Sequence, residues 1–135
     1  MSLYLTFISL SDEWSLDMQI LIAEDEVGTN ETYRIFLEGS GHKVTVTANG
    51  EECMELYRRK GGAFDVVILD YRMPIKDGGI VLQELLEANP NQKVLIASAY
   101  SADIINGLYL KASKVKVMQK PFDLQDLLST VNDFS

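Results

Sequence analysis

Cysteine and histidine are almost absent from this chain, which has one of each, Cys53 and His42. A single cysteine excludes a disulfide within the chain, and two such residues are too few for a zinc site. His42 follows a glycine-rich turn, and we assign it no catalytic role. Cys53 stands at helical spacing with Leu56 and Tyr57, which predicts a small buried side chain. The lack of disulfides favours a reducing compartment, and we expect a cytoplasmic protein.

Basic residues are also scarce, with 12 Lys and Arg against 20 Asp and Glu and a net charge of −8. Nucleic-acid binding needs Lys and Arg against phosphate, so we expect no direct contact with nucleic acid.

The apolar stretch at residues 3–10 is too short to span a bilayer, and no basic residue precedes Arg34, so we expect neither membrane insertion nor a signal peptide. We expect residues 1–17 to be an N-terminal appendage, either a short element on an exposed face or a loosely held terminus. Met1–Leu3 is a candidate expression remnant.

The pattern of residues 18–135 predicts one domain of five strand–helix units. Each strand is a short apolar or β-branched run, and each helix has apolar residues at i, i+3 and i+4. The strands are expected at 19–23, 43–47, 66–70, 93–97 and 115–119. Helices are expected at about 28–38, 50–60, 78–88, 102–111 and 124–131, with Asp123 as the cap of the last. This alternation predicts an α/β fold with a parallel sheet and helices on both faces.

Reactive side chains stand at the carboxyl ends of four predicted strands. Glu24 and Asp25 follow the first strand, Asp70 ends the third, Ser98 follows the fourth and Lys120 follows the fifth. Because ligands bind at the carboxyl ends of the strands in such sheets, we expect these side chains to share one site. Clustered carboxylates favour a hard divalent cation such as Mg²⁺, and Lys120 supplies a positive charge for an anion. A carboxylate, a metal, an ammonium and a hydroxyl together indicate phosphoryl transfer onto Asp70.

Each of these residues alone also has an ordinary structural interpretation. Asp25 after a strand is typical of a helix cap, Ser98 of a turn, and Lys120 before a proline of the surface. Their joint occurrence favours the functional interpretation.

Four motifs carry a resemblance to a known family. They are Ile20-Leu-Ile-Ala-Glu24-Asp25-Glu26, then Asp65-Val-Val-Ile-Leu-Asp70 with Met73-Pro74 and Asp77-Gly78, then Ser98-Ala99, and Lys120-Pro121-Phe122. In this order and spacing they resemble the receiver domain of two-component response regulators, over residues 19 to about 133. The resemblance implies a flavodoxin-like, doubly wound sheet of order 2-1-3-4-5. It also implies a phosphoacceptor signalling domain rather than an enzyme, with at most self-catalysed phosphorylation and slow autodephosphorylation.

The resemblance further assigns roles and partners. A sensor histidine kinase or phosphotransfer protein would phosphorylate Asp70, with Mg²⁺ held by Glu24, Asp25, Asp70 and the backbone carbonyl of Arg72. Ser98 would hydrogen-bond the phosphoryl group and Lys120 would pair with it. The signal would be passed to a protein partner, or to a second copy in a homodimer, by the face made of the fourth helix, fifth strand and fifth helix.

Helix 102–111 has more apolar positions than one buried stripe needs: Ile104, Ile105, Leu108, Tyr109 and Leu110. They favour a partner surface and a broad core face equally.

Three features depart from the common receiver pattern. Glu24 stands where Asp is frequent, and its longer carboxylate can still reach a metal. Val117 stands where many receivers have an aromatic side chain that turns inward on activation, so coupling must run through Ser98 and its loop. Arg72 and Tyr100 are bulky at the two variable positions beside the site, which predicts slow self-dephosphorylation.

Three other functions compete with this interpretation. A phosphatase of the haloacid-dehalogenase kind needs a second Asp two positions after the nucleophile, where this chain has Arg72. A flavodoxin-type cofactor binder needs a phosphate loop after the first strand, where residues 24–26 are acidic instead. A receiver that serves only as a docking module, with phosphorylation lost or incidental, stays open. No recognisable output domain follows Ser135, so we expect a stand-alone regulator or a fragment of a longer regulator or hybrid kinase.

Overall fold

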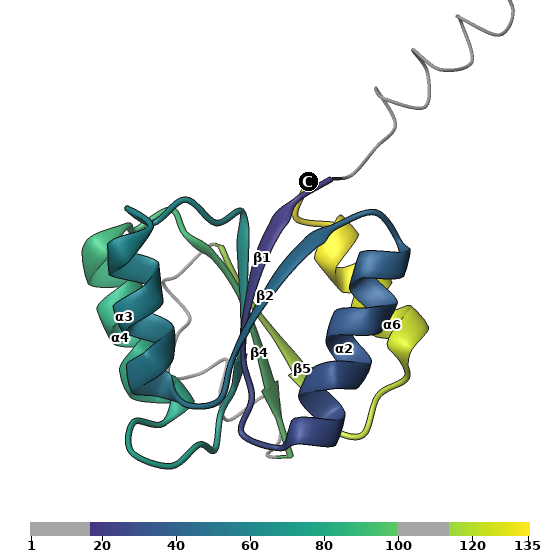
Figure 1. Ribbon diagram of the computed structural model, residues 1–135, viewed down its shortest axis with the longest axis horizontal. Coiled ribbons are helices and arrows are strands. Elements are labelled where there is room, and N and C mark those ends of the chain that lie inside the picture. Colours follow the sequence, from purple (N-terminus) through teal and green to yellow (C-terminus); the bar gives the residue numbers. More distant parts are fainter. Residues whose placement is uncertain (1–16, 100–113) are drawn as a thin grey trace, which may run out of the picture.

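The computed structural model describes residues 17–99 and 114–135, which fold around a single parallel sheet (Figure 1). Its strands are β1 (Gln19–Ala23), β2 (Lys43–Thr47), β3 (Val66–Asp70), β4 (Lys93–Ser98) and β5 (Val115–Gln119). The described helices are α2 (Val27–Gly39), α3 (Gly50–Arg59), α4 (Gly78–Ala88) and α6 (Leu124–Asn132). The sheet order is β2-β1-β3-β4-β5, so the predicted flavodoxin-like topology is confirmed.

Some predictions fall outside the described residues. They include helix 102–111 with its apolar positions, Tyr100, and nearly all of the appendage at residues 1–17. The domain boundary at residue 18 therefore stays a prediction.

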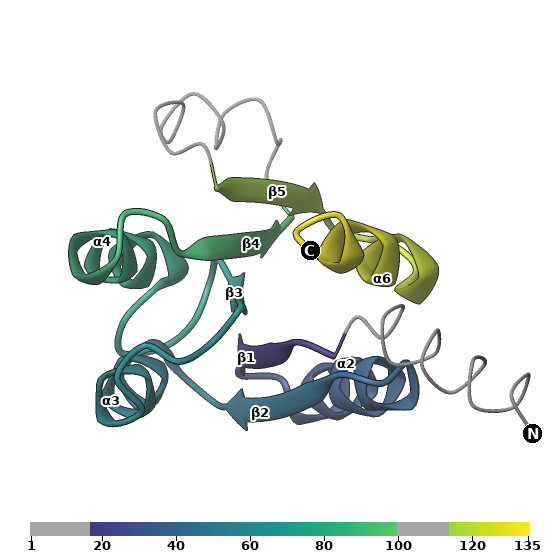
Figure 2. The same ribbon diagram turned by 90° about the horizontal axis from the view of Figure 1, so that it is seen from above.

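Helices cover both faces of the sheet, α3 and α4 on one side and α2 and α6 on the other (Figure 2). Because side chains alternate along a strand, Leu21 and Ala23 pack toward α3 and α4, whereas Ile20 and Ile22 pack toward α2 and α6. The central strands β1, β3 and β4 are almost wholly buried, which explains their unbroken apolar runs. Two apolar cores, one on each face, hold the strands in register.

The helix termini follow the sequence signals closely. Asn49, Asp77 and Asp123 each accept a hydrogen bond from the backbone N–H three residues on, at 2.8, 3.0 and 2.8 Å. These side chains satisfy backbone donors that the first helical turn leaves unpaired. The prediction that Asp123 caps the last helix is confirmed.

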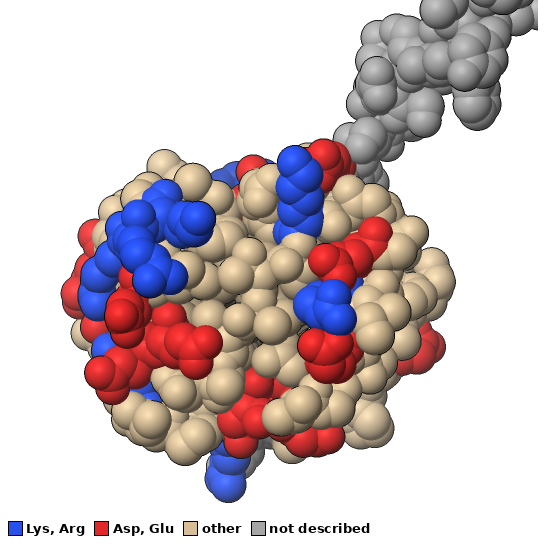
Figure 3. All heavy atoms as spheres, viewed as in Figure 1, with Lys and Arg blue, Asp and Glu red and all other residues tan. Residues whose placement is uncertain are grey.

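Charges on α3 are separated along the helix. Glu51 and Glu52 lie in its first turn and Arg58 and Arg59 in its last, and Figure 3 shows the acidic and basic side chains as separate groups on this side of the molecule. This arrangement complements the helix dipole, with anions near the positive N-terminus and cations near the C-terminus. The charge pattern thus stabilises the helix.

The two rare side chains both have structural positions. Cys53 is fully buried as predicted, and burial raises the pKa of its thiol to about 12. His42 is also buried: its Nδ1 accepts from the Met18 N–H at 3.2 Å, and its Nε2 lies 3.0 Å from Asn132 Oδ1. It therefore links the start of β1 to the end of α6. In the described residues, no helix has the length and apolar character needed to cross a membrane.

Candidate functional site

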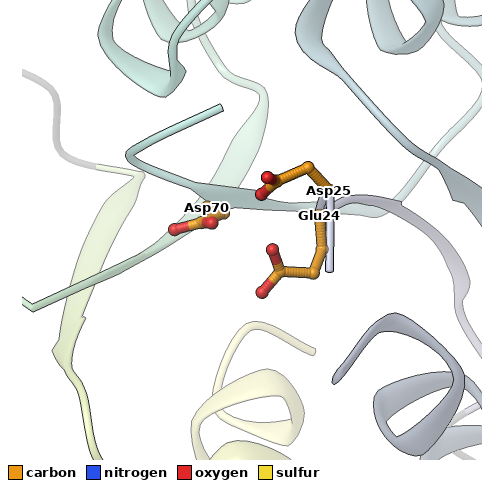
Figure 4. Close-up of side chains that lie close together, drawn as sticks. All are labelled: Glu24, Asp25 and Asp70. Carbon is orange, nitrogen blue, oxygen red and sulfur yellow. The ribbon is translucent and has the colours of Figure 1, made fainter. Parts of the chain in front are cut away.

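Three carboxylates gather at the carboxyl ends of β1 and β3. The two strands are neighbours, with Ala23 opposite Leu69, so the next residues of each strand, Glu24 and Asp70, come side by side. Carboxylate oxygens of Glu24, Asp25 and Asp70 all lie within 4.8 Å of one another. Figure 4 shows these three side chains converging from the two strand ends. The sheet register thus concentrates negative charge at one point.

Glu24 is the buried member of this cluster, with only 3% of its surface exposed. The pKa of its carboxyl is raised from 4.5 to about 7, chiefly by burial and then by the hydrogen bond to Asp70 and the negative charge of Asp70. The positive charge of Lys120 and the Glu26 N–H, which donates to Glu24 Oε2 at 3.3 Å, oppose this shift. The cluster therefore carries more negative charge than its protein surroundings neutralise, which is a condition that favours cation binding.

Asp25 is exposed, and it does not cap the helix that follows. The N-cap position of α2 is Glu26, which makes no side-chain capping hydrogen bond. The ordinary interpretation of Asp25 as a helix cap is therefore wrong, and its carboxylate faces Glu24 and Asp70 instead.

Lys120 connects the end of β5 to the carboxylates. Its Nζ lies 3.2 Å from Glu24 Oε1 and 3.3 Å from Asp70 Oδ1. Burial lowers the pKa of the ammonium, but the charges of Asp70 and Glu24 outweigh burial and raise it overall. Lys120 thus stays cationic beside both carboxylates. Its interpretation as an ordinary surface lysine does not fit this position.

Ser98 is the last residue of β4, one residue beyond the predicted end of that strand. It stays in the sheet because it pairs with Gln119 of β5, and its carbonyl accepts from the Lys120 N–H at 2.7 Å. Only 2% of its surface is exposed. A pocket of about 390 Å³ opens beside it, lined by Asp70, Arg72, Ser98, Ala99 and Lys120. This pocket has room for a small anion next to Asp70 and Lys120.

The loop after Asp70 folds back, so that the start of α4 contacts the backbone at the end of β3. The Gly78 N–H donates to the Tyr71 carbonyl at 2.8 Å, and a Cβ at Gly78 would lie 2.5 Å from the Asp70 carbonyl oxygen. Only glycine allows α4 to begin this close to Asp70. The Asp77-Gly78 pair is therefore a steric requirement of the site, with Asp77 capping the helix.

The structure brings Glu24, Asp25, Asp70, Ser98 and Lys120 to one edge of the sheet, and Arg72 lines the pocket. One neighbour of this group could not be predicted from the sequence. Tyr33 of α2 stacks on Phe122, two residues after Lys120, with ring centroids 6.0 Å apart. The only sequence signal for it is a tyrosine on the apolar face of that helix.

The donor set fits a divalent cation. Three carboxylates present oxygen ligands within 4.8 Å of one another, and one of them is buried with a raised pKa. Oxygen ligands of this kind suit Mg²⁺, which takes one or two carboxylates together with phosphate and water.

Comparisons with known proteins agree with this arrangement. Residues 20–132 match the family model for the response regulator receiver domain. The chain is 32% identical over 114 residues to the sensor kinase CckA of Brucella abortus (strain 2308), and 32% identical over 116 residues to the transcriptional regulatory protein ZraR of Klebsiella oxytoca. These alignments cover 84% and 86% of this chain but 12% and 26% of the relatives.

A solved structure matches over nearly its full length. The crystal structure of a response regulator receiver domain protein from Clostridium thermocellum is 26% identical, with a TM-score of 0.79, and the match covers 86% of this chain and 92% of that one. This chain therefore belongs to the response regulator receiver domain family. It is a phosphoacceptor signalling module of two-component systems, and the acidic pocket of Glu24, Asp25 and Asp70 is consistent with the phosphorylation site.

Proposed function

We propose that Asp70 is the phosphoacceptor of this receiver and takes its phosphoryl group from a partner histidine kinase or phosphotransfer protein. The observation that carries this proposal is the position of the Asp70 carboxylate. It lies 3.3 Å from the Lys120 ammonium, within the acidic cluster, and it lines the pocket that Ser98 also lines. A nucleophile, a fixed cation and space for an anion meet at this point.

Phosphoryl transfer here is catalysed by position and charge. One Asp70 oxygen forms a bond to phosphorus while the bond from phosphorus to the donor's histidine nitrogen breaks. That nitrogen keeps the electron pair and takes a proton. The Lys120 ammonium neutralises charge on the phosphoryl oxygens, and the Ser98 hydroxyl donates a hydrogen bond to one of them. The product is an acyl phosphate on Asp70.

Glu24, Asp25, Asp70 and the backbone carbonyl of Arg72 would hold Mg²⁺ at this site. The ion would supply positive charge against the phosphoryl oxygens. The raised pKa of Glu24 supports this assignment, because a buried carboxylate with too few cationic neighbours gains most from an added cation. Glu24 must lose its proton to serve as a ligand.

Two exposed apolar side chains flank the site and support docking of a protein donor. Val27, at the start of α2, is 75% exposed, and Ile75, in the loop after Asp70, is 74% exposed. A kinase that presents its phosphohistidine to Asp70 must pass close to both loops.

The phosphorylated state would be read on a face that includes β5 and α6. The support is the hydrogen bond from the Lys120 N–H to the Ser98 carbonyl, which ties the ends of β4 and β5 together. A movement of Ser98 or Lys120 toward a phosphoryl group would therefore shift the start of the loop before α6. A protein partner or a second copy would bind this face, in the cytoplasm. The alternative is a docking module that works without phosphorylation.

The test is incubation with acetyl phosphate, with and without Mg²⁺, followed by intact mass measurement. We expect a Mg²⁺-dependent phosphate adduct on the parent protein and none on a folded Asp70→Asn variant. A folded protein that binds Mg²⁺ but forms no adduct, from acetyl phosphate or from a histidine kinase, would instead support the docking module.

A further inference from the structure

Lys120 is held in the site by contacts at both ends of its residue. Its Nζ contacts the carboxylates of Glu24 and Asp70, and its backbone N–H donates to the Ser98 carbonyl at 2.7 Å. The side chain between them has four rotatable carbon–carbon bonds and is 29% exposed. A lysine stem of this length has considerable rotamer entropy, so neighbouring structure must restrict it. Lys120 begins the loop after β5, which also includes Pro121 and Phe122.

Phe122 anchors that loop to α2. Its ring stacks on Tyr33 with centroids 6.0 Å apart and an angle of 21° between the planes. Tyr33 is buried, with 8% of its surface exposed, and both rings belong to the apolar core between the sheet, α2 and α6. Aromatic pairs with this spacing stabilise a fold beyond the effect of the apolar area that they bury.

The same helix is fixed to the acidic cluster one turn earlier. Asn30 is buried, and its Nδ2 donates to the Glu24 carbonyl at 2.9 Å and to the Thr47 carbonyl at 3.1 Å. Asn30 and Tyr33 are three positions apart, so they share one helix face. One face of α2 therefore holds the Glu24 backbone through Asn30 and the Lys120 loop through Tyr33.

The charged groups of the site also act on the pKa of the Tyr33 phenol. Burial raises the pKa of the phenol, Lys120 lowers it, and Glu24 and Asp70 raise it. Tyr33 therefore lies within electrostatic range of the carboxylates and the ammonium, as well as packing against Phe122.

We propose that Tyr33 is a positioning residue for Lys120, acting through its stack on Phe122. The α2 helix then sets the distance between the acidic cluster and the ammonium, because it contacts the elements that carry both. This inference rests on the proposed phosphoacceptor function, and it adds a residue outside the pocket that controls how fast Asp70 is phosphorylated.

The first test compares Tyr33→Leu with Tyr33→Phe, which keeps the stacked ring and loses only the hydroxyl. We expect Tyr33→Leu to lower the maximal rate of phosphoryl uptake from acetyl phosphate by about fivefold, and Tyr33→Phe to keep the parent rate. Phe122→Leu should resemble Tyr33→Leu, and the double variant should be no slower than either single one. Leu37→Ala, in the same helix and core, is the control for loss of stability alone and should keep the parent rate.

The second readout does not depend on phosphorylation. The ¹⁵Nζ signal of Lys120, assigned by its loss in Lys120→Met, should be sharp in the parent and in Tyr33→Phe and broadened in Tyr33→Leu. If the parent takes up no phosphoryl group, the proposed function fails, and this signal still decides the positioning role. An unchanged Lys120 signal in a folded Tyr33→Leu protein would overturn the proposal, as would a Tyr33→Phe rate as low as that of Tyr33→Leu.

Discussion

The ammonium of Lys120 lies 3.2 Å from a carboxylate oxygen of Glu24, a residue 96 positions earlier in the chain. The contact exists because β1 and β5 end at the same edge of the parallel sheet, on either side of β3 and β4. It leaves Asp70, which ends β3, between a buried acid and a fixed cation.

Loss of the Lys120 ammonium should slow phosphorylation strongly. In Lys120→Met we expect uptake from acetyl phosphate to fall by roughly 10²-fold, because one preorganised charge against the phosphoryl oxygens is lost. The matched control is Lys116→Met at the other end of β5, where the ammonium lies 4.5 Å from the centre of the Phe134 ring. Equal rates in these two variants, measured by intact mass over time, would contradict the assigned role of Lys120.

Glu24 should make the metal-free protein less stable as the pH rises. Its folded-state pKa of about 7 lies above the usual 4.5, so the folded state binds the proton more tightly. The resulting stabilisation is complete below pH 4.5 and is lost as the pH rises through 7. Glu24→Gln should therefore raise the free energy of unfolding by roughly 1–3 kcal/mol at pH 8 and by little at pH 4.5.

Urea unfolding in EDTA, at several pH values, measures this difference. A Glu24→Gln effect that does not vary between pH 4.5 and 8 would contradict the raised pKa of Glu24. Saturating Mg²⁺ should reverse the order at pH 8, because it stabilises the parent and binds the variant less well.

Ile75 is a β-branched residue with φ of 72°, a backbone conformation that costs such residues about 1–2 kcal/mol. Asparagine adopts a positive φ more readily than a β-branched residue does, so Ile75→Asn should stabilise the protein by roughly 0.5–1 kcal/mol. Ile80→Asn, at another exposed isoleucine but within α4, should be neutral or destabilising. Thermal unfolding of both variants measures the contrast, and a loss of stability in Ile75→Asn would contradict it.

If Ile75 also contacts the donor protein, Ile75→Asn should lower the ratio of the kinase-dependent rate to the acetyl phosphate rate. The small donor makes no protein contact, so it reports the chemistry alone. An unchanged ratio would remove Ile75 from the docking surface.

Arg72 should help to preserve the acyl phosphate, since it lines the pocket beside Asp70. The variant Arg72→Ala/Tyr100→Ala should lose its phosphoryl group several times faster, because smaller side chains give water access to phosphorus. The decay of the adduct after removal of the donor measures its lifetime. Equal lifetimes in the parent and the double variant would refute the prediction.

Much of the fold could be predicted because the local signals agree. The apolar runs of β1, β3 and β4 reflect burial on both faces, and Asp123 caps α6 as its position indicates. The site residues follow from topology, since the ends of parallel strands must meet at one edge. The end of β4 was missed by one residue because pairing with Gln119, a tertiary contact, retains Ser98 in the sheet.

Other features could not be predicted, since they depend on contacts distant in sequence. The stack of Tyr33 on Phe122 joins residues from the first and last parts of the domain, and neither sequence position carries a sign of the other. The buried His42 likewise obtains its partners, Met18 and Asn132, only in the folded chain. At Ile75 the residue type itself is misleading, because isoleucine is disfavoured at the positive φ that this turn imposes.

Whether Asp70 receives the phosphoryl group is decided by identifying the modified residue. Protein treated with acetyl phosphate and Mg²⁺ would be reduced with borohydride, which converts an aspartyl phosphate to homoserine, and then sequenced by mass spectrometry. We predict homoserine at position 70 only, and only when Mg²⁺ was present. Homoserine at Asp25 or at another carboxylate, with Asp70 unchanged, would contradict the assignment.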